Sequence, residues 1–175
     1  KKESVADTAR VLERQVAQIV WRTYSQAGLD EMAANSSVPV INALSDSWHP
    51  CQLLADLMTI KECFGKTEGL KLAYVGDANN NMANSYLGAC AMAGMDVSIA
   101  APEGYGPDDA VLDRAREIAG IQGGKITSSN DPLEAVESAH VVVTDTWVSM
   151  GMEDQAQERA LVFQAFTVDS ALMSK

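Results

Sequence analysis

Four short apolar runs of this sequence are each followed by side chains that could bind a polar ligand. These side chains include Arg22, His49, Gln52, the asparagines at 79–81, Asp145 and Ser149. In open α/β sheets, ligands bind outside the carboxyl ends of the strands, where neighbouring strand ends bring such groups together. If the apolar runs are parallel strands, the sequence predicts one polar binding site at this edge of the sheet.

His49 and Gln52 flank the first turn of a predicted helix that begins at Pro50. The free N–H groups and the dipole of a helix start favour an anion or a polarised carbonyl. Together with the planar donor fork of Arg22, these residues could hold a phosphorylated carbonyl compound. The alternative is an ordinary capped helix with a hydrogen-bonded, partly buried histidine. A zinc site at His49 and Cys51 would lack a third ligand.

The turn at 76–81 reads Gly-Asp-Ala-Asn-Asn-Asn, where a dinucleotide-binding fold would place G-x-G-x-x-G. Only the first glycine is present, so the close backbone approach to a pyrophosphate is lost. The asparagine amides could instead bind a carboxylate or an ammonium group, or they could simply cap the next helix. Asp145, with Ser149 nearby, could pair with a ligand ammonium, or these residues could form a plain turn.

Hydrophobic patterns predict the elements that would position these residues. Strands are expected at 18–21, 38–42, 70–75, 97–101, 125–127 and 140–144, with a weaker one at 166–168. Helices are expected at 5–16, 27–35, 50–64, 79–93, 107–119, 132–138 and 153–164. Such alternation, with right-handed crossovers, predicts a mostly parallel sheet covered by helices on both faces.

Composition narrows the possible functions. The 175 residues carry 13 Lys/Arg against 24 Asp/Glu, a net charge of −11, which argues against nucleic acid or an anionic membrane as a partner. Residues 67–175 hold 16 of the acidic side chains and 6 of the basic ones, which suits an amine-bearing partner or a merely solubilising surface. Three cysteines without a C-x-x-C pair predict a reducing, cytoplasmic location.

Three motifs together resemble the aspartate/ornithine carbamoyltransferase family. They are His-Pro-Cys-Gln at 49–52, Gly-Asp followed by Asn-Asn at 76–80, and Asp-Thr-Trp-Val-Ser-Met-Gly at 145–151. The first is shared across the family, whereas the Ser-Met-Gly loop is similar to that of its ornithine-specific members. The resemblance extends over the whole chain.

The resemblance implies transfer of a carbamoyl group from carbamoyl phosphate to the δ-amine of L-ornithine, without a cofactor or a metal. Arg22, His49 and Gln52 would bind carbamoyl phosphate, and Arg22 and His49 would also be the catalytic residues that stabilise charge on its carbonyl oxygen. The ornithine site would consist of Asn80, Asp145, Ser149 and Met150. A homotrimer, or a multiple of trimers, is the expected assembly.

The resemblance also implies an α/β fold of two three-layer domains with mostly parallel sheets, the second Rossmann-like. Residues 1–48 would end the carbamoyl phosphate domain, 49–66 would be a connecting helix, and 67–175 would form most of the ornithine domain.

Two family motifs are missing from this sequence, the phosphate-binding Ser-Thr-Arg-Thr and the ornithine-contacting His-Cys-Leu-Pro. We therefore expect a central piece of the enzyme that is inactive alone. Two alternatives stay open: a non-catalytic carbamoyltransferase chain that only binds ligands or subunits, and a nicotinamide-dependent oxidoreductase.

Overall fold

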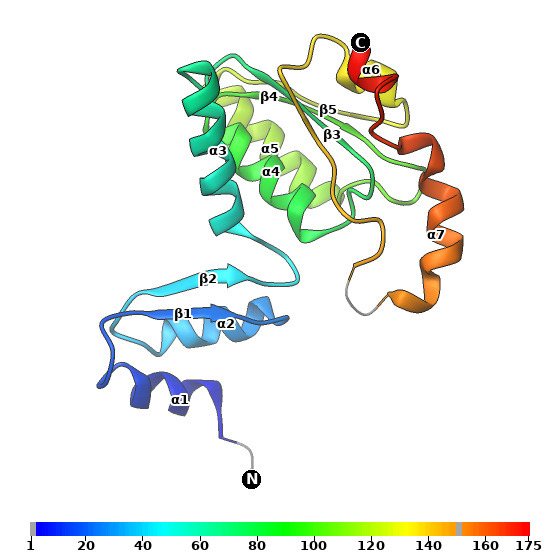
Figure 1. Ribbon diagram of the computed structural model, residues 1–175. Helices are drawn as coiled ribbons and strands as arrows, with labels where there is room; N and C mark the ends of the chain where they lie inside the picture. Colours follow the sequence, from blue (N-terminus) through cyan, green and yellow to red (C-terminus); the bar gives the residue numbers. More distant parts are fainter. Residues whose placement is uncertain (1–2, 150–151) are drawn as a thin grey trace.

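The computed structural model describes residues 3–149 and 152–175, which form two α/β units (Figure 1). The first unit contains α1 (Val5–Leu12), β1 (Ile19–Arg22), α2 (Gln26–Ala34) and β2 (Val40–Leu44). The two strands are parallel, with Ile19 opposite Val40. Ala9, Ile19 and Met32 form the buried centre of this unit. The first unit is therefore a small core that carries Arg22 at the end of β1.

Helix α3 (Pro50–Phe64) follows β2 and leads into the second unit. It begins at a proline and ends where Gly65 adopts a left-handed conformation with φ of +74°, which favours glycine. Leu53 and Ile60 are buried in the core of the second unit, where α3 lies beside α4 (Asn81–Met92) (Figure 1). The helix predicted to connect the two units thus packs on the second unit. The predicted domain boundaries after residues 48 and 66 stay a prediction.

The second unit is built on a parallel four-stranded sheet of order β5-β4-β3-β6. Its strands are β3 (Lys71–Val75), β4 (Asp96–Ala100), β5 (Ile126–Ser129) and β6 (Val141–Val143). Side chains alternate along β3, so that Leu72 and Tyr74 join one core and Ala73 and Val75 the other. Two separate cores on one sheet mean that helices cover both of its faces.

Helices α4 and α5 (Asp109–Gln122) pack with α3 on one face of this sheet. Helices α6 (Pro132–Val136) and α7 (Ala156–Phe163) contribute to the core on the other face. Short 3-10 helices complete the chain: η1 (Glu153–Gln155), η2 (Gln164–Phe166) and η3 (Leu172–Ser174). No helix among the described residues is long and apolar enough to cross a membrane.

The predicted mixed α/β fold with parallel sheets is confirmed, but some element boundaries differ. The weak strand predicted at 166–168 is wrong, because Phe166 ends η2 and buries its ring in the second core rather than in a strand ladder. The helix predicted from residue 79 begins at Asn81, because the Asn80 side chain accepts the Ala83 N–H and caps it. The first helix ends at Leu12, short of the predicted residue 16.

Candidate functional site

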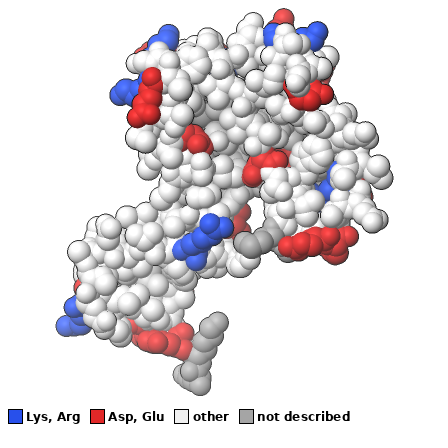
Figure 2. Space-filling model, viewed as in Figure 1, with Lys and Arg blue, Asp and Glu red and all other residues white. Residues whose placement is uncertain are grey.

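A cleft of about 620 Å³ lies between the two units, where the space-filling view shows a hollow (Figure 2). Its walls come from residues that follow β1, β2, β3 and β6, as the carboxyl-end rule predicts. Six of the residues predicted for the site line it, namely Arg22, His49, Gln52, Asn80, Asp145 and Ser149. The seventh, Met150, lies outside the described residues. The structure thus brings together groups that are up to 127 positions apart, from 22 to 149.

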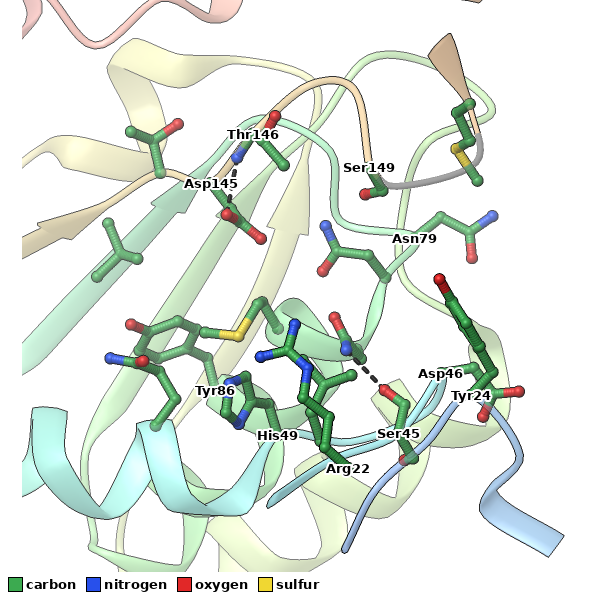
Figure 3. Close-up of a pocket in the computed structure, with 18 residues that line it drawn as sticks. Arg22, Tyr24, Ser45, Asp46, His49, Asn79, Tyr86, Asp145, Thr146 and Ser149 are labelled. Atoms are coloured by element: carbon green, nitrogen blue, oxygen red, sulfur yellow. Dashed lines mark hydrogen bonds between the residues drawn. The ribbon is translucent and has the colours of Figure 1, made fainter. Parts of the chain in front are cut away.

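Arg22 is the last residue of β1, just after a shift in the strand register at Trp21. Its side chain lies beside His49 in the cleft (Figure 3). No hydrogen bond or ion pair with another described residue engages its guanidinium group. Because the five N–H groups of this fork are free, Arg22 can bind an anionic or carbonyl oxygen of a ligand.

His49 stands at the N-terminus of α3, yet its ring does not cap the helix. Its Nδ1 atom is buried without a hydrogen-bond partner among the described residues. Burial lowers the pKa of the imidazole below its usual value of 6.5, and the neighbouring charge of Arg22 lowers that pKa further. A neutral imidazole therefore faces the cleft, with one donor and one acceptor nitrogen.

The loop that carries His49 is fastened to α4 of the second unit. The Asn81 Nδ2 group donates to the carbonyl of Ser45 at 2.7 Å. The His49 N–H donates to the Ser85 hydroxyl at 2.8 Å. Ser45 itself is fully buried. The histidine is therefore positioned by the second unit, although it follows a strand of the first.

The three consecutive asparagines have three different roles. Asn80 caps α4, and its Nδ2 group donates to the Asp77 carbonyl at 2.9 Å. Asn81 holds the loop at Ser45. The carboxamide of Asn79 has no hydrogen bond to another described residue, and it lies with Ser149 across the cleft from Arg22 and His49 (Figure 3). Asn79 therefore has the free amide, although the sequence did not single it out. A contact between Asn80 and ornithine stays a prediction.

Asp145 follows β6 and is half-buried in the cleft wall. One carboxylate oxygen accepts the N–H of Thr146 at 2.8 Å, and this bond fixes the side chain in the cleft (Figure 3). Burial raises the pKa of Tyr74, and the charge of Asp145 adds to this effect. At His49, burial lowers the pKa, and the charge of Asp145 opposes this lowering only in part. This carboxylate is therefore placed to pair with a cationic group of a ligand.

Sequence reasoning missed a buried ion pair behind the cleft. Arg159 of α7 donates to the carboxylate of Asp77, and both side chains are almost fully buried. The guanidinium also lies over the rings of Tyr105 and Phe163, with centroids 5.1 and 5.2 Å away. Burial raises the pKa of Asp77, while the Asn79 N–H and the Arg159 charge lower it.

A signal for this pair was present in the sequence. Arg159 is the only Lys or Arg residue of the sequence between Lys125 and Lys175, in a segment rich in Asp and Glu. A single arginine in an acidic segment is a candidate for an ion pair with one particular carboxylate, whereas an arginine that is merely solvated at the surface needs no fixed partner. Its burial, however, depends on the folded packing of α7.

The cleft thus has two chemically different sides. Arg22 and His49 offer free donors on one side, and Asp145 offers a carboxylate across from them (Figure 3). The first side suits an anion with an adjacent carbonyl, and the second suits an ammonium group. Among the described residues, no group of three His, Cys, Asp or Glu side chains could hold a metal ion.

Comparisons with known proteins agree with this arrangement. Residues 1–62 match the carbamoyl-P binding domain of aspartate/ornithine carbamoyltransferases, and residues 68–175 match their Asp/Orn binding domain. The chain belongs to the aspartate/ornithine carbamoyltransferase family.

Curated relatives include ornithine carbamoyltransferases from two species. The chain is 58% identical to that of Renibacterium salmoninarum over 173 residues, 99% of this chain and 56% of the relative. It is 59% identical to that of Clavibacter michiganensis over 172 residues, 98% of this chain and 56% of the relative. The chain therefore spans about half the length of these relatives.

Solved structures show the same likeness. The ornithine carbamoyltransferase of Pyrococcus furiosus superposes with a TM-score of 0.94 at 46% identity, covering 99% of this chain and 55% of that one. The corresponding enzyme of Gloeobacter violaceus has a TM-score of 0.89 at 47% identity, covering 99% of this chain and 57% of that one.

Proposed function

We propose that this chain forms the central cleft of an ornithine carbamoyltransferase. In this reaction the δ-amine nitrogen of L-ornithine bonds to the carbonyl carbon of carbamoyl phosphate. The bond from that carbon to the phosphate oxygen breaks, one proton leaves the nitrogen, and the products are L-citrulline and phosphate. The observation that carries the proposal is the pairing of free donors, Arg22 and His49, opposite the carboxylate of Asp145 in one cleft.

On the donor side, Arg22, His49 and Gln52 would bind carbamoyl phosphate. The N–H groups of Arg22 and His49 would face its carbonyl oxygen and stabilise the negative charge that develops there during attack. A neutral imidazole suits this role, because it donates a hydrogen bond without needing to gain a proton. No covalent intermediate with the protein is required.

On the carboxylate side, Asn80, Asp145, Ser149 and Met150 would bind the α-amino acid end of ornithine. The Asp145 carboxylate would pair with the α-ammonium group, and the δ-amine would then extend toward the carbonyl carbon. Catalysis would come mainly from holding the two substrates in line and from electrostatic stabilisation. The free amide of Asn79 is available beside them.

The alternative is a chain that binds ligands or other subunits without turnover. The 175 residues contain neither Ser-Thr-Arg-Thr nor His-Cys-Leu-Pro, and they span 56% of the length of the relatives. Within the proposed function, we further propose a homotrimer, a cytoplasmic location and a role in arginine biosynthesis. Free cysteines, two of them exposed, support a reducing compartment.

A colorimetric citrulline assay tests the proposal on two proteins. One is the 175-residue chain. The other, called the extended chain, joins the same residues to the flanking segments of the Renibacterium salmoninarum relative. We expect citrulline from the extended chain only, because the phosphate-binding motif is needed for turnover. An inactive, folded extended chain would support the non-catalytic alternative, and saturable turnover by the 175-residue chain would show that phosphate binding resides in other residues.

A further inference from the structure

Asp56 lies on α3, one turn beyond Gln52, and uses both of its carboxylate oxygens inside the protein. The Gln52 Nε2 group donates to Oδ1 at 2.9 Å. The Tyr86 hydroxyl, from α4, donates to Oδ2 at 2.6 Å. Gln52 and Tyr86 both line the cleft, whereas Asp56 does not. The carboxylate therefore connects two residues of the cleft wall that come from different helices.

The Tyr86 end of this connection is rigid. Tyr86 is only 5% exposed, and its ring lies 5.8 Å from that of Tyr74, centroid to centroid. Burial and the bond to Asp56 raise its pKa, which is consistent with a protonated hydroxyl that donates to this carboxylate. The preceding residue, Ser85, accepts the His49 N–H at 2.8 Å. The first turns of α3 are thus fixed to α4 at residue 49 and again at residue 56.

The Gln52 end is exposed and would be mobile without this support. The terminal torsion of a glutamine side chain has a broad range, so an unsupported carboxamide rotates freely in solvent. With Nε2 held by Asp56, the planar carboxamide turns its oxygen away from Asp56. That oxygen and the second N–H are then available to a ligand in one orientation.

We propose that Asp56 is a positioning residue of the cleft, which orients the Gln52 carboxamide by anchoring it to Tyr86. Only the identity of the ligand, carbamoyl phosphate, rests on the proposed function. The orientation of Gln52 is a property of the 175-residue chain and is measurable without substrate.

Nuclear magnetic resonance relaxation of side-chain amides tests the orientation directly. In the parent chain the Gln52 amide should be ordered compared with that of Gln122, which ends α5 on the surface. Asp56→Asn should lower its order parameter below about 0.6, the range of flexible groups. Tyr86→Phe keeps the charge of Asp56 but removes the hydroxyl that anchors it. This change should lower the order parameter of the Gln52 amide by less than Asp56→Asn does. Glu62→Gln, an exposed change near the end of α3, is the matched control and should have no effect.

The pKa of His49 gives a second spectroscopic measure of the Asp56 charge. The charged groups that act on the imidazole are Arg22 from β1, Asp56 from α3 and Asp145 after β6. Asp56→Asn removes a negative charge and should lower that pKa, whereas Tyr86→Phe should leave it nearly unchanged. The chain has two histidines, and His140 serves as the internal reference.

In the extended chain, Asp56→Asn should raise KM for carbamoyl phosphate roughly 2–10-fold, the cost of ordering one flexible side chain, with ornithine KM unchanged. On a Gln52→Ala background the same change should raise this KM no further, because the orienting effect of Asp56 is exerted through Gln52. A Gln52 amide as mobile as Gln122 in the parent, or unaffected by Asp56→Asn, would overturn the proposal. An ordered amide in a protein that makes no citrulline would refute only the proposed function.

Discussion

Arg159 and Asp77 form a buried ion pair that joins the segment after β3 to helix α7. The same guanidinium donates from Nε to the carbonyl of Trp147, which lies between Asp145 and Ser149. One buried side chain therefore holds the two segments that carry Asn79 and Asp145. Breaking such a pair leaves an uncompensated charge in the interior.

We expect Arg159→Gln to destabilise the 175-residue chain by about 3–5 kcal/mol, because Asp77 would lose its partner while remaining buried. Urea denaturation followed by circular dichroism measures this loss. Arg116→Gln is the matched control, because Arg116 pairs with Asp113 on the surface and should change stability by about 1 kcal/mol or less. Equal losses in the two variants would show that the buried pair adds no more than a surface contact.

His49→Ala in the extended chain should lower kcat by about 10²–10³-fold, because a preformed donor to the developing oxyanion is lost. His49→Gln keeps an N–H donor and should lose less. Steady-state citrulline formation gives both values, with His140→Gln as the control away from the cleft. Parent-like rates for both His49 variants would leave this histidine a purely structural residue.

Asp145→Asn in the extended chain should impair ornithine binding roughly 10–150-fold, since a charge-assisted hydrogen bond is worth about 1.5–3 kcal/mol. Part of the loss should appear in kcat, because a loosely held substrate drifts from its line of attack. Ornithine kinetics test this, and calorimetric titration of carbamoyl phosphate should remain near the parent value. Asp113→Asn, on the surface of α5, is the control. A similar loss for both ligands would remove Asp145 from an ornithine-specific role.

The stability of the 175-residue chain should fall as the pH drops through about 6.5. The pKa of His49 is lower in the folded chain than its usual value of 6.5, so the unfolded chain takes up the proton first. The contribution of His49 to folding stability is complete above pH 6.5. It reaches its minimum below the pKa that His49 has in the folded chain. Urea unfolding at several pH values should show that stability depends less steeply on pH in His49→Gln than in the parent chain. Identical slopes for parent and His49→Gln would contradict the lowered pKa.

The sequence was sufficient to predict the features that depend on short-range patterns, namely the strands and the residues that follow them. The strands at 70–75 and 97–101 were recognisable because near-continuous apolar runs, each interrupted by a single polar residue, are typical of strands buried on both faces. Placing polar residues after each strand was enough to predict that His49 and Asp145 share a site. The carboxyl-end rule needs only the order of strands and helices, not their packing.

Other features depend on packing that no local pattern contains. Arg159 stands out in the sequence as a lone arginine in an acidic segment, but its burial against Asp77 depends on how α7 packs. Which asparagine caps α4 depends on where the chain turns after Asp77, so the free amide proved to be Asn79. Phe166 looked like a strand residue, yet its burial comes from the core beneath α6 and η3.

The small core of the first unit has a consequence for local opening of the 175-residue chain. Its cluster has three buried members among the described residues, whereas the larger core of the second unit has nineteen. Amide hydrogens of β1 should therefore exchange with solvent through a partial opening that leaves β3 closed. Arg22 belongs to the part that opens, while His49 is fastened to α4. A ligand that bridges these two residues will slow exchange in β1 more than in β3.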